Sequence, residues 1–149
     1  MNNLRQIGVA FLEYANDFDG WLPLSYPINA GEPNWVYPQQ IGRYVGIGGP
    51  NTVWVCASAT SSEKLNGRTY GMNCNINLSK YRHRVDNINA TPETVLVADN
   101  RGNDALIYDD SVAWANIAKR HNQGAFALYC DFHVAWRKDY PFKIFNPNK

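Results

Sequence analysis

Residues 3–18 read NLRQIGVAFLEYANDF, and this stretch determines the predicted fold. Its apolar side chains recur at steps of three and four residues, a spacing that places them on one face of an α-helix. Gly20 and Pro23 mark the end of this helix, and Asn3 with Gln6 resembles a capping pair at its start. The apolar face begins with the first residues of the chain, so we expect this helix to be the lower half of a longer one. The face comprises Leu4, Ile7, Phe11, Tyr14 and Phe18.

The composition predicts one globular domain and excludes several classes of function. A chain of 149 residues can bury a core of its own, so we expect a single domain over residues 1–149. The formal net charge of +1 argues against a partner nucleic acid, which requires an extended basic surface, whereas the basic cluster at residues 80–84 is short. The sequence has no run of about 18 apolar residues, the length typical of a membrane span.

A second structural signal is a β-hairpin over residues 125–137. Two apolar-rich runs, 125–130 and 133–137, are separated only by Asp131 and Phe132, and a two-residue connection is typical of a tight hairpin. Such a hairpin has one apolar face that matches the apolar face of the helix, and we expect the two to pack together. The residues of this predicted contact are Ala127, Tyr129, Val134 and Trp136 on the hairpin, and Leu4, Ile7, Phe11 and Tyr14 on the helix.

Cysteine, histidine and aspartate side chains around the hairpin are the candidates for catalysis. The predicted pairing brings Cys130 next to His133, while His121 and Asp131 lie before and after the first strand. A zinc site needs three or four ligands, and a thiolate nucleophile needs a base with a polarising neighbour, but the pairing supplies only the one Cys–His contact. The sequence also lacks the Gly-x-Ser-x-Gly and His-Glu-x-x-His motifs. We therefore predict that the protein is not an enzyme.

Calcium is the better candidate among metals. One acidic loop offers several carboxylates, which are the hard oxygen ligands that calcium prefers. Their spacing matches no EF-hand, and such loops are often merely solvated, so both interpretations stay open; no other cofactor is expected. The candidate ligands are Asp99, Asp104, Asp109 and Asp110.

The N-terminal stretch resembles the segment that follows the membrane helix in prepilin-like proteins, a group related to the type II secretion pseudopilins. The resemblance lies in residues 2–8, NNLRQIG, and continues through Tyr14 to Gly20, Leu22 and Pro23. Two later segments resemble landmarks of the same group, namely Trp54-Val55-Cys56 and Tyr70-Gly71-Met72-Asn73.

The C-terminal stretch resembles the His-x9-Asp-Gly signature of this group. His121 and Asp131 occupy its polar positions, His133 follows, and Phe132 stands where the family has Gly. A type I′ turn needs positive φ at both central positions, which penalises Phe, so we expect a type I turn or a longer, bulged one. We expect structural roles, with Asp131 accepting hydrogen bonds from turn amides and His121 bonding a neighbouring backbone group.

The resemblance implies an α+β, pilin-like fold, in which a long N-terminal helix packs on a small antiparallel sheet with long loops. Family members carry a cleaved, N-methylated leader and an apolar membrane helix directly upstream. The resemblance thus implies an extracytoplasmic domain, periplasmic or on the cell surface, that is anchored in the cytoplasmic membrane. Its expected function is that of a non-enzymatic subunit of a type II secretion or type IV pilus-like assembly, with other pseudopilins, pilins and secretion machinery as partners.

Two further expectations depend on this location. The compartment is oxidising, and Cys56 and Cys74 lie at the edges of polar loops, so these two are expected to form the disulfide if any pair does, leaving Cys130 reduced. The alternative function is a membrane-anchored binding module, in which aromatic side chains line a carbohydrate groove. Those aromatic residues are Trp21, Tyr26, Trp35 and Tyr37.

Overall fold

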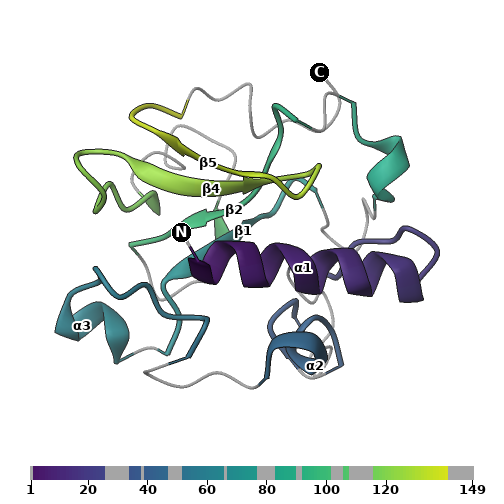
Figure 1. Cartoon of the computed structure of the whole chain (residues 1–149), viewed down its shortest axis with the longest axis horizontal. Coiled ribbons are helices and arrows are strands. Elements are labelled where there is room, and N and C mark those ends of the chain that lie inside the picture. The colour runs from purple at the N-terminus through teal and green to yellow at the C-terminus, as the bar shows by residue number, and fades with distance from the viewer. Residues whose placement is uncertain are drawn as a thin grey trace.

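Figure 1 shows the computed structural model of the chain, in which a long N-terminal helix runs along a twisted sheet. The structure describes residues 2–25, 34–37, 39–46, 52–65, 67–76, 83–89, 92–101, 106–107 and 116–140. Four strands of the sheet are antiparallel, and a short fifth strand pairs in parallel at one edge. The predicted α+β class, with a helix packed on a small antiparallel sheet, is therefore confirmed.

Helix α1 covers Asn2–Asp17, where residues 3–18 were predicted. It ends because Asp19 and Gly20 have positive φ, and the Gly20 amide donates to the Ala15 carbonyl at 2.7 Å. Asn3 lies inside the helix, where its side-chain amide donates to the Val55 carbonyl at 2.8 Å, so its predicted role as a cap is wrong. The other helices are short: α2 (Gly42–Val45), α3 (Ser61–Lys64) and the 3₁₀ helix η1 (Val85–Asn87).

The sheet has the strand order β3-β1-β2-β4-β5. Its central strand, β2, reads VLVAD and is buried along its whole length, since it is paired on both sides and covered on both faces. The strands are β1 (Tyr70–Asn73), β2 (Val95–Asp99), β3 (Leu106–Ile107), β4 (Ala125–Tyr129) and β5 (Val134–Arg137).

The hairpin formed by β4 and β5 has a longer turn than the two residues between its apolar runs. Leu128 pairs with Val134, which leaves three residues between Tyr129 and His133. The amide of Phe132 donates to the Tyr129 carbonyl at 2.9 Å, and Phe132 itself has a φ of +66°. This is the arrangement of a type I turn followed by a left-handed bulge residue. The expected type I or bulged turn is therefore confirmed.

This one-residue change of register changes which side of the sheet the β5 residues occupy. Leu128 and Cys130 belong to the core that lies under α1, and Val134 packs against the same core. Ala127 and Tyr129 instead belong to a smaller core on the other face of the sheet. The predicted packing of these two residues against the helix is therefore wrong. Trp136 is not buried beneath the helix either, since 42% of its surface is exposed.

The helix side of the predicted contact is correct. Leu4, Ile7, Phe11 and Tyr14 are all buried, and they form one core with residues of β1, β2 and β4. At Gly8 the helix lies close to the sheet, because a Cβ added there would lie 2.9 Å from the Leu128 side chain. A glycine at this position therefore lets α1 lie directly on β4.

The other side of α1 is covered by the segment that leads into α2, which lies across the helix from the sheet in Figure 1. Phe11 stacks on Trp35 with 5.8 Å between ring centroids, and Trp35 meets Trp54 edge-on at 5.5 Å. The Tyr44 hydroxyl donates to the Asp17 carboxylate at 2.6 Å, which ties α2 to the last turn of α1. Two sides of α1 are thus packed, one against the sheet and one against an aromatic cluster.

Candidate functional site

Three side chains that can ligate a metal or carry chemistry meet beside the end of β2. The sulfur of Cys56 and the Oδ2 atom of Asp99 each lie 3.3 Å from the same nitrogen, Nε2 of His121. All three of these atoms lie within 4.8 Å of one another. Cys56 and Asp99 are buried, and the His121 side chain is 19% exposed. We call this group the Cys56–Asp99–His121 cluster.

Backbone structure fixes the position of each member. Asp99 is the last residue of β2, and the Cys56 amide donates to the Thr69 hydroxyl at 2.6 Å, just before β1 begins. His121 opens a two-residue turn, in which its amide and carbonyl both bond to Gly124 at 3.0 Å. The two central residues, at positions 122 and 123, have positive φ, as a type I′ turn requires.

The carboxylate of Asp99 is buried but well supplied with donors. Its Oδ1 atom accepts from Nη1 of Arg120 at 3.2 Å, and its Oδ2 atom accepts from the Phe126 amide at 3.1 Å. Burial raises the pKa of Asp99, because it disfavours the charged form, and the Phe126 amide, Arg120 and His121 act in the opposite direction. Burial outweighs these groups, so the pKa of Asp99 lies above its ordinary value although Arg120 and the Phe126 amide both contact the carboxyl group.

Arg120 links this carboxylate to α3. Its Nη2 atom donates to Oε1 of Glu63 and to the carbonyl of Asn100, both at 2.8 Å. Glu63 is also part of the capping box that starts α3, together with Thr60. Burial favours a higher pKa for Glu63, but the bonds from Thr60 and Arg120 outweigh it and hold the pKa below its ordinary value. The Arg120 guanidinium thus forms ion pairs with the carboxylates of both Asp99 and Glu63.

The exposed edge of the cluster opens into a cavity. This cavity has a volume of about 380 Å³ and is lined by His121, Asn122, Phe126 and Trp136. The Trp136 indole N–H donates to the His121 carbonyl at 2.7 Å, and the His121 and Phe126 rings meet edge-on with 5.0 Å between centroids. Solvent therefore reaches the cluster on the side of the imidazole.

The structure changes the predicted roles of the cysteines. Cys56 and Cys74 are not joined by a disulfide, and the Cys56 sulfur lies against His121 instead. Because none of the three cysteines forms a disulfide, the expectation that Cys56 and Cys74 would be the pair, if any pair formed, stays a prediction. Cys130 forms no disulfide either, and burial raises the pKa of its thiol, which keeps it protonated in the core.

The structure also changes the predicted calcium site. Asp99 is not in a loop but at the end of a central strand, where its carboxylate contacts Arg120, His121 and the Phe126 amide. The prediction that it belongs to an acidic loop is therefore wrong. The other three candidates, Asp104, Asp109 and Asp110, lie outside the described residues.

The signature residues lie in two different places: His121 belongs to the Cys56–Asp99–His121 cluster, whereas Asp131 and His133 contact each other in the turn after β4. Asp131 accepts from the amide of His133 at 3.2 Å and contacts its Nδ1 atom at 2.5 Å, so Asp131 does accept a turn amide as expected. The His133 ring stacks on Tyr129 with 4.4 Å between centroids, on the partly exposed outside of the turn, whereas Cys130 is fully buried. The imidazole of His121 meets side chains, not the backbone group that was expected.

Sequence reasoning missed Cys56 and Asp99 as the partners of His121, and Arg120 as a partner of Asp99. Cys56 and His121 are 65 residues apart in the chain, and Asp99 and Arg120 are 21 apart. No local spacing motif connects residues at such separations. The one available signal was the Arg120–His121 pair at the start of the signature, where two basic side chains directly precede a tight turn.

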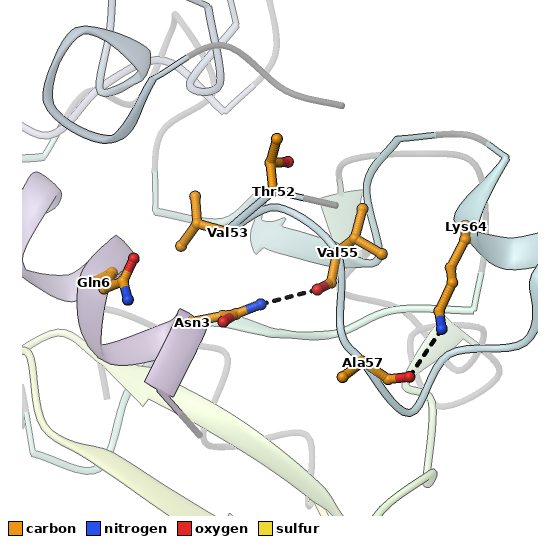
Figure 2. Close-up of a pocket in the computed structure, with 7 residues that line it drawn as sticks. All are labelled: Asn3, Gln6, Thr52, Val53, Val55, Ala57 and Lys64. Atoms are coloured by element: carbon orange, nitrogen blue, oxygen red, sulfur yellow. Dashed lines mark hydrogen bonds between the residues drawn. The ribbon is translucent and has the colours of Figure 1, made fainter. Parts of the chain in front are cut away.

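A second hollow lies at the start of α1, and Figure 2 shows the residues that line it. It has a volume of about 360 Å³. Asn3 and Lys64 reach the segment 52–57 from the two sides, donating to the carbonyls of Val55 and Ala57 at 2.8 and 2.9 Å. These bonds hold that segment against α1 and α3, which is a structural role. The lining residues are Asn3, Gln6, Thr52, Val53, Val55, Ala57 and Lys64.

No family model, curated protein or solved structure matches the chain. Within the described residues, no helix combines the length and the apolar character that crossing a bilayer requires.

Proposed function

We propose that this chain is the globular head of a pseudopilin-like subunit, which acts by assembly through α1 and without catalysis. The observation that carries the proposal is an apolar pair on the outer side of α1. Val9 is 59% exposed and Leu12 is 42% exposed, while the opposite side of the helix is fully buried. The fold of the head does not use these two side chains, so they are available to a neighbouring subunit.

The surroundings of this pair support an interface. Isolated exposed apolar residues are common on soluble proteins, but Val9 also lines a hollow of about 470 Å³ between α1 and α2. A groove next to an apolar helix face accepts side chains from a second helix. The residues of this hollow are Gln6, Val9, Ala10, Glu13, Tyr44 and Val45.

Two other apolar residues of the helix and the hairpin are not available for contacts between subunits. Leu4 is buried and Phe126 packs against the core under α1, so neither serves as a contact with another subunit. In this proposal, contact between heads depends on Val9 and Leu12. An upstream apolar helix continues α1 into the cytoplasmic membrane, the head lies outside it, and the partners are other pseudopilins or pilins and secretion machinery.

The carbohydrate-binding alternative receives less support. Trp35, one of its four aromatic residues, is fully buried between Phe11 and Trp54. Tyr37 is exposed, Trp21 is partly buried, and Tyr26 lies outside the described residues. A groove that depends on all four rings would therefore lack the Trp35 ring, which is buried in the core.

Cross-linking tests the proposal. The full-length chain with its own upstream segment is expressed in its own host, carrying Val9→Cys or Leu12→Cys, and is treated with a bifunctional thiol reagent. We expect a ladder of oligomers from both variants. The matched control is Leu65→Cys, since Leu65 is 86% exposed and follows α3, so it is not part of the outer face of α1. Monomers from all three variants would contradict assembly through α1, as would equal ladders from all three.

A further inference from the structure

We propose that Cys56, Asp99 and His121 bind one thiophilic divalent metal ion, with zinc as the best match. This inference concerns the Cys56–Asp99–His121 cluster alone and does not depend on the proposed function. The cluster gathers one thiol, one carboxylate and one imidazole from three separate segments of the chain, and two of these groups are buried. Each of the three is an established ligand of zinc.

Two of the three distances between the donor atoms match those between zinc ligands, and the third, between sulfur and oxygen, is at most 4.8 Å. Zinc binds sulfur at about 2.3 Å and nitrogen or oxygen at about 2.0–2.2 Å, so two ligands of a tetrahedral ion lie about 3.3–3.6 Å apart. The S–N and N–O distances in the cluster are both 3.3 Å. A small adjustment of side chains therefore suffices to seat an ion between them.

The arrangement fits a ligand set better than it fits a catalytic triad. In a triad the nucleophile and the carboxylate contact opposite nitrogens of the imidazole, so that the ring passes a proton between them. Here Cys56 and Asp99 both face Nε2 of His121. Because the sulfur and the carboxylate oxygen both face this nitrogen, the three donor atoms surround one point at which a metal ion can bind.

The charges around the cluster also favour a cation. Arg120 faces two carboxylates, those of Asp99 and Glu63, at 3.2 and 2.8 Å. The Arg120 guanidinium, the two carboxylates and the Cys56 thiolate together carry a charge of −2, which a bound dication neutralises. A soft thiolate ligand selects a transition metal over calcium or magnesium. The second carboxylate oxygen of Asp99 is held by Arg120, which is the kind of outer support that orients metal ligands.

The open side of the cluster supplies a route for the ion. The cavity that is lined by His121 and Trp136 reaches the imidazole from solvent. Three protein ligands leave a fourth position for water or for an exogenous ligand, as in zinc sites that are not purely structural.

Cobalt(II), a spectroscopic substitute for zinc, tests the proposal on the 149-residue chain after dialysis against a chelator. We expect one equivalent to bind, with a thiolate-to-cobalt charge-transfer absorption and the intense visible bands of a tetrahedral ion, and zinc to displace it. Cys56→Ser should abolish the charge-transfer absorption. His121→Asn should weaken binding by at least about 100-fold.

Cys74→Ser and His133→Asn are the matched controls, since each removes the same functional group outside the cluster, and both should bind like the unmodified chain. Failure of the unmodified chain to give a charge-transfer absorption at saturating cobalt would overturn the proposal without any variant. It would also be overturned if the absorption persisted in Cys56→Ser.

Discussion

The turn before β4 and the turn after it both place residues other than glycine at positive φ, but they differ in length. The first turn has two central residues, Asn122 and Gln123, with φ of +50° and +60°. The second has three residues between Tyr129 and His133, of which Phe132 alone has positive φ. The length of the second turn, three residues and not two, decides on which face of the sheet each β5 side chain lies.

The second turn therefore controls the surroundings of the first. The three-residue connection pairs Trp136 with Phe126, and in this register the indole lies against Gly124 and donates to the His121 carbonyl. A two-residue connection would turn Trp136 to the other face and uncover the first turn. The hairpin register thus helps to hold His121 in the Cys56–Asp99–His121 cluster.

The largest expected effect tests which face of the hairpin lies under α1. Leu128→Ala should lower the free energy of unfolding by about 2–5 kcal/mol, because it leaves a cavity in the core beneath the helix. Trp136→Ala should cost less, since the indole is partly exposed. Urea denaturation measures both. A larger loss from Trp136→Ala than from Leu128→Ala would indicate the two-residue register.

The next effect tests the contact between the two turns. A Cβ at Gly124 would lie closest to the carbonyl oxygen of Arg137 and 2.6 Å from the Trp136 ring, so Gly124→Ala should destabilise the fold by about 1–3 kcal/mol through overpacking against both. Gly67→Ala is the control, because nothing lies within 4 Å of its Cβ and only its φ of +68° opposes a side chain. If Gly124→Ala cost no more than Gly67→Ala, Trp136 would not cover the first turn.

A smaller effect isolates the strain at Phe132. Phe132→Gly and Phe132→Ala both remove the ring from the core, but only Gly adopts a φ of +66° without strain. The Gly variant should therefore be more stable than the Ala variant by about 1 kcal/mol. The same pair of substitutions at Phe126, in the middle of β4, should show the reverse order, since glycine weakens a strand. Thermal unfolding of the four variants compares the two positions.

The smallest effect concerns the ion pair beside the first turn. Glu63→Gln keeps the capping box but removes the charge that faces Arg120, so it should cost less than about 1 kcal/mol at neutral pH. Because the folded-state pKa of Glu63 is lowered, this contribution is complete above the unfolded pKa and disappears as pH falls through the folded pKa. Stability curves of the two proteins should therefore converge in acid. A constant difference across that range would assign the effect to packing.

Much of the fold follows from short-range patterns in the sequence. The buried face of α1 was predicted correctly from Leu4 to Tyr14, because helical periodicity depends only on neighbouring residues. Phe18 was wrongly included, since it follows the end of the helix and is 37% exposed. The location of the hairpin was also predicted from neighbouring residues. Its register was not, since the cost of Phe132 at positive φ is offset by packing of its ring against the core under α1, a contact that local pattern does not contain.

The candidate site also combines features that local sequence determines with features that only the tertiary structure determines. The sequence by itself determined a helix, a hairpin and a histidine before the hairpin, because each depends on residues close together in the chain. Only the tertiary structure decided that Cys56 meets His121 instead of Cys74, and that Asp99 faces Arg120 instead of an acidic loop. The physical reason is that sheet pairing joins the end of β2 to the start of β4 across distant segments, and a buried carboxylate is stable only where that pairing brings it positive charge.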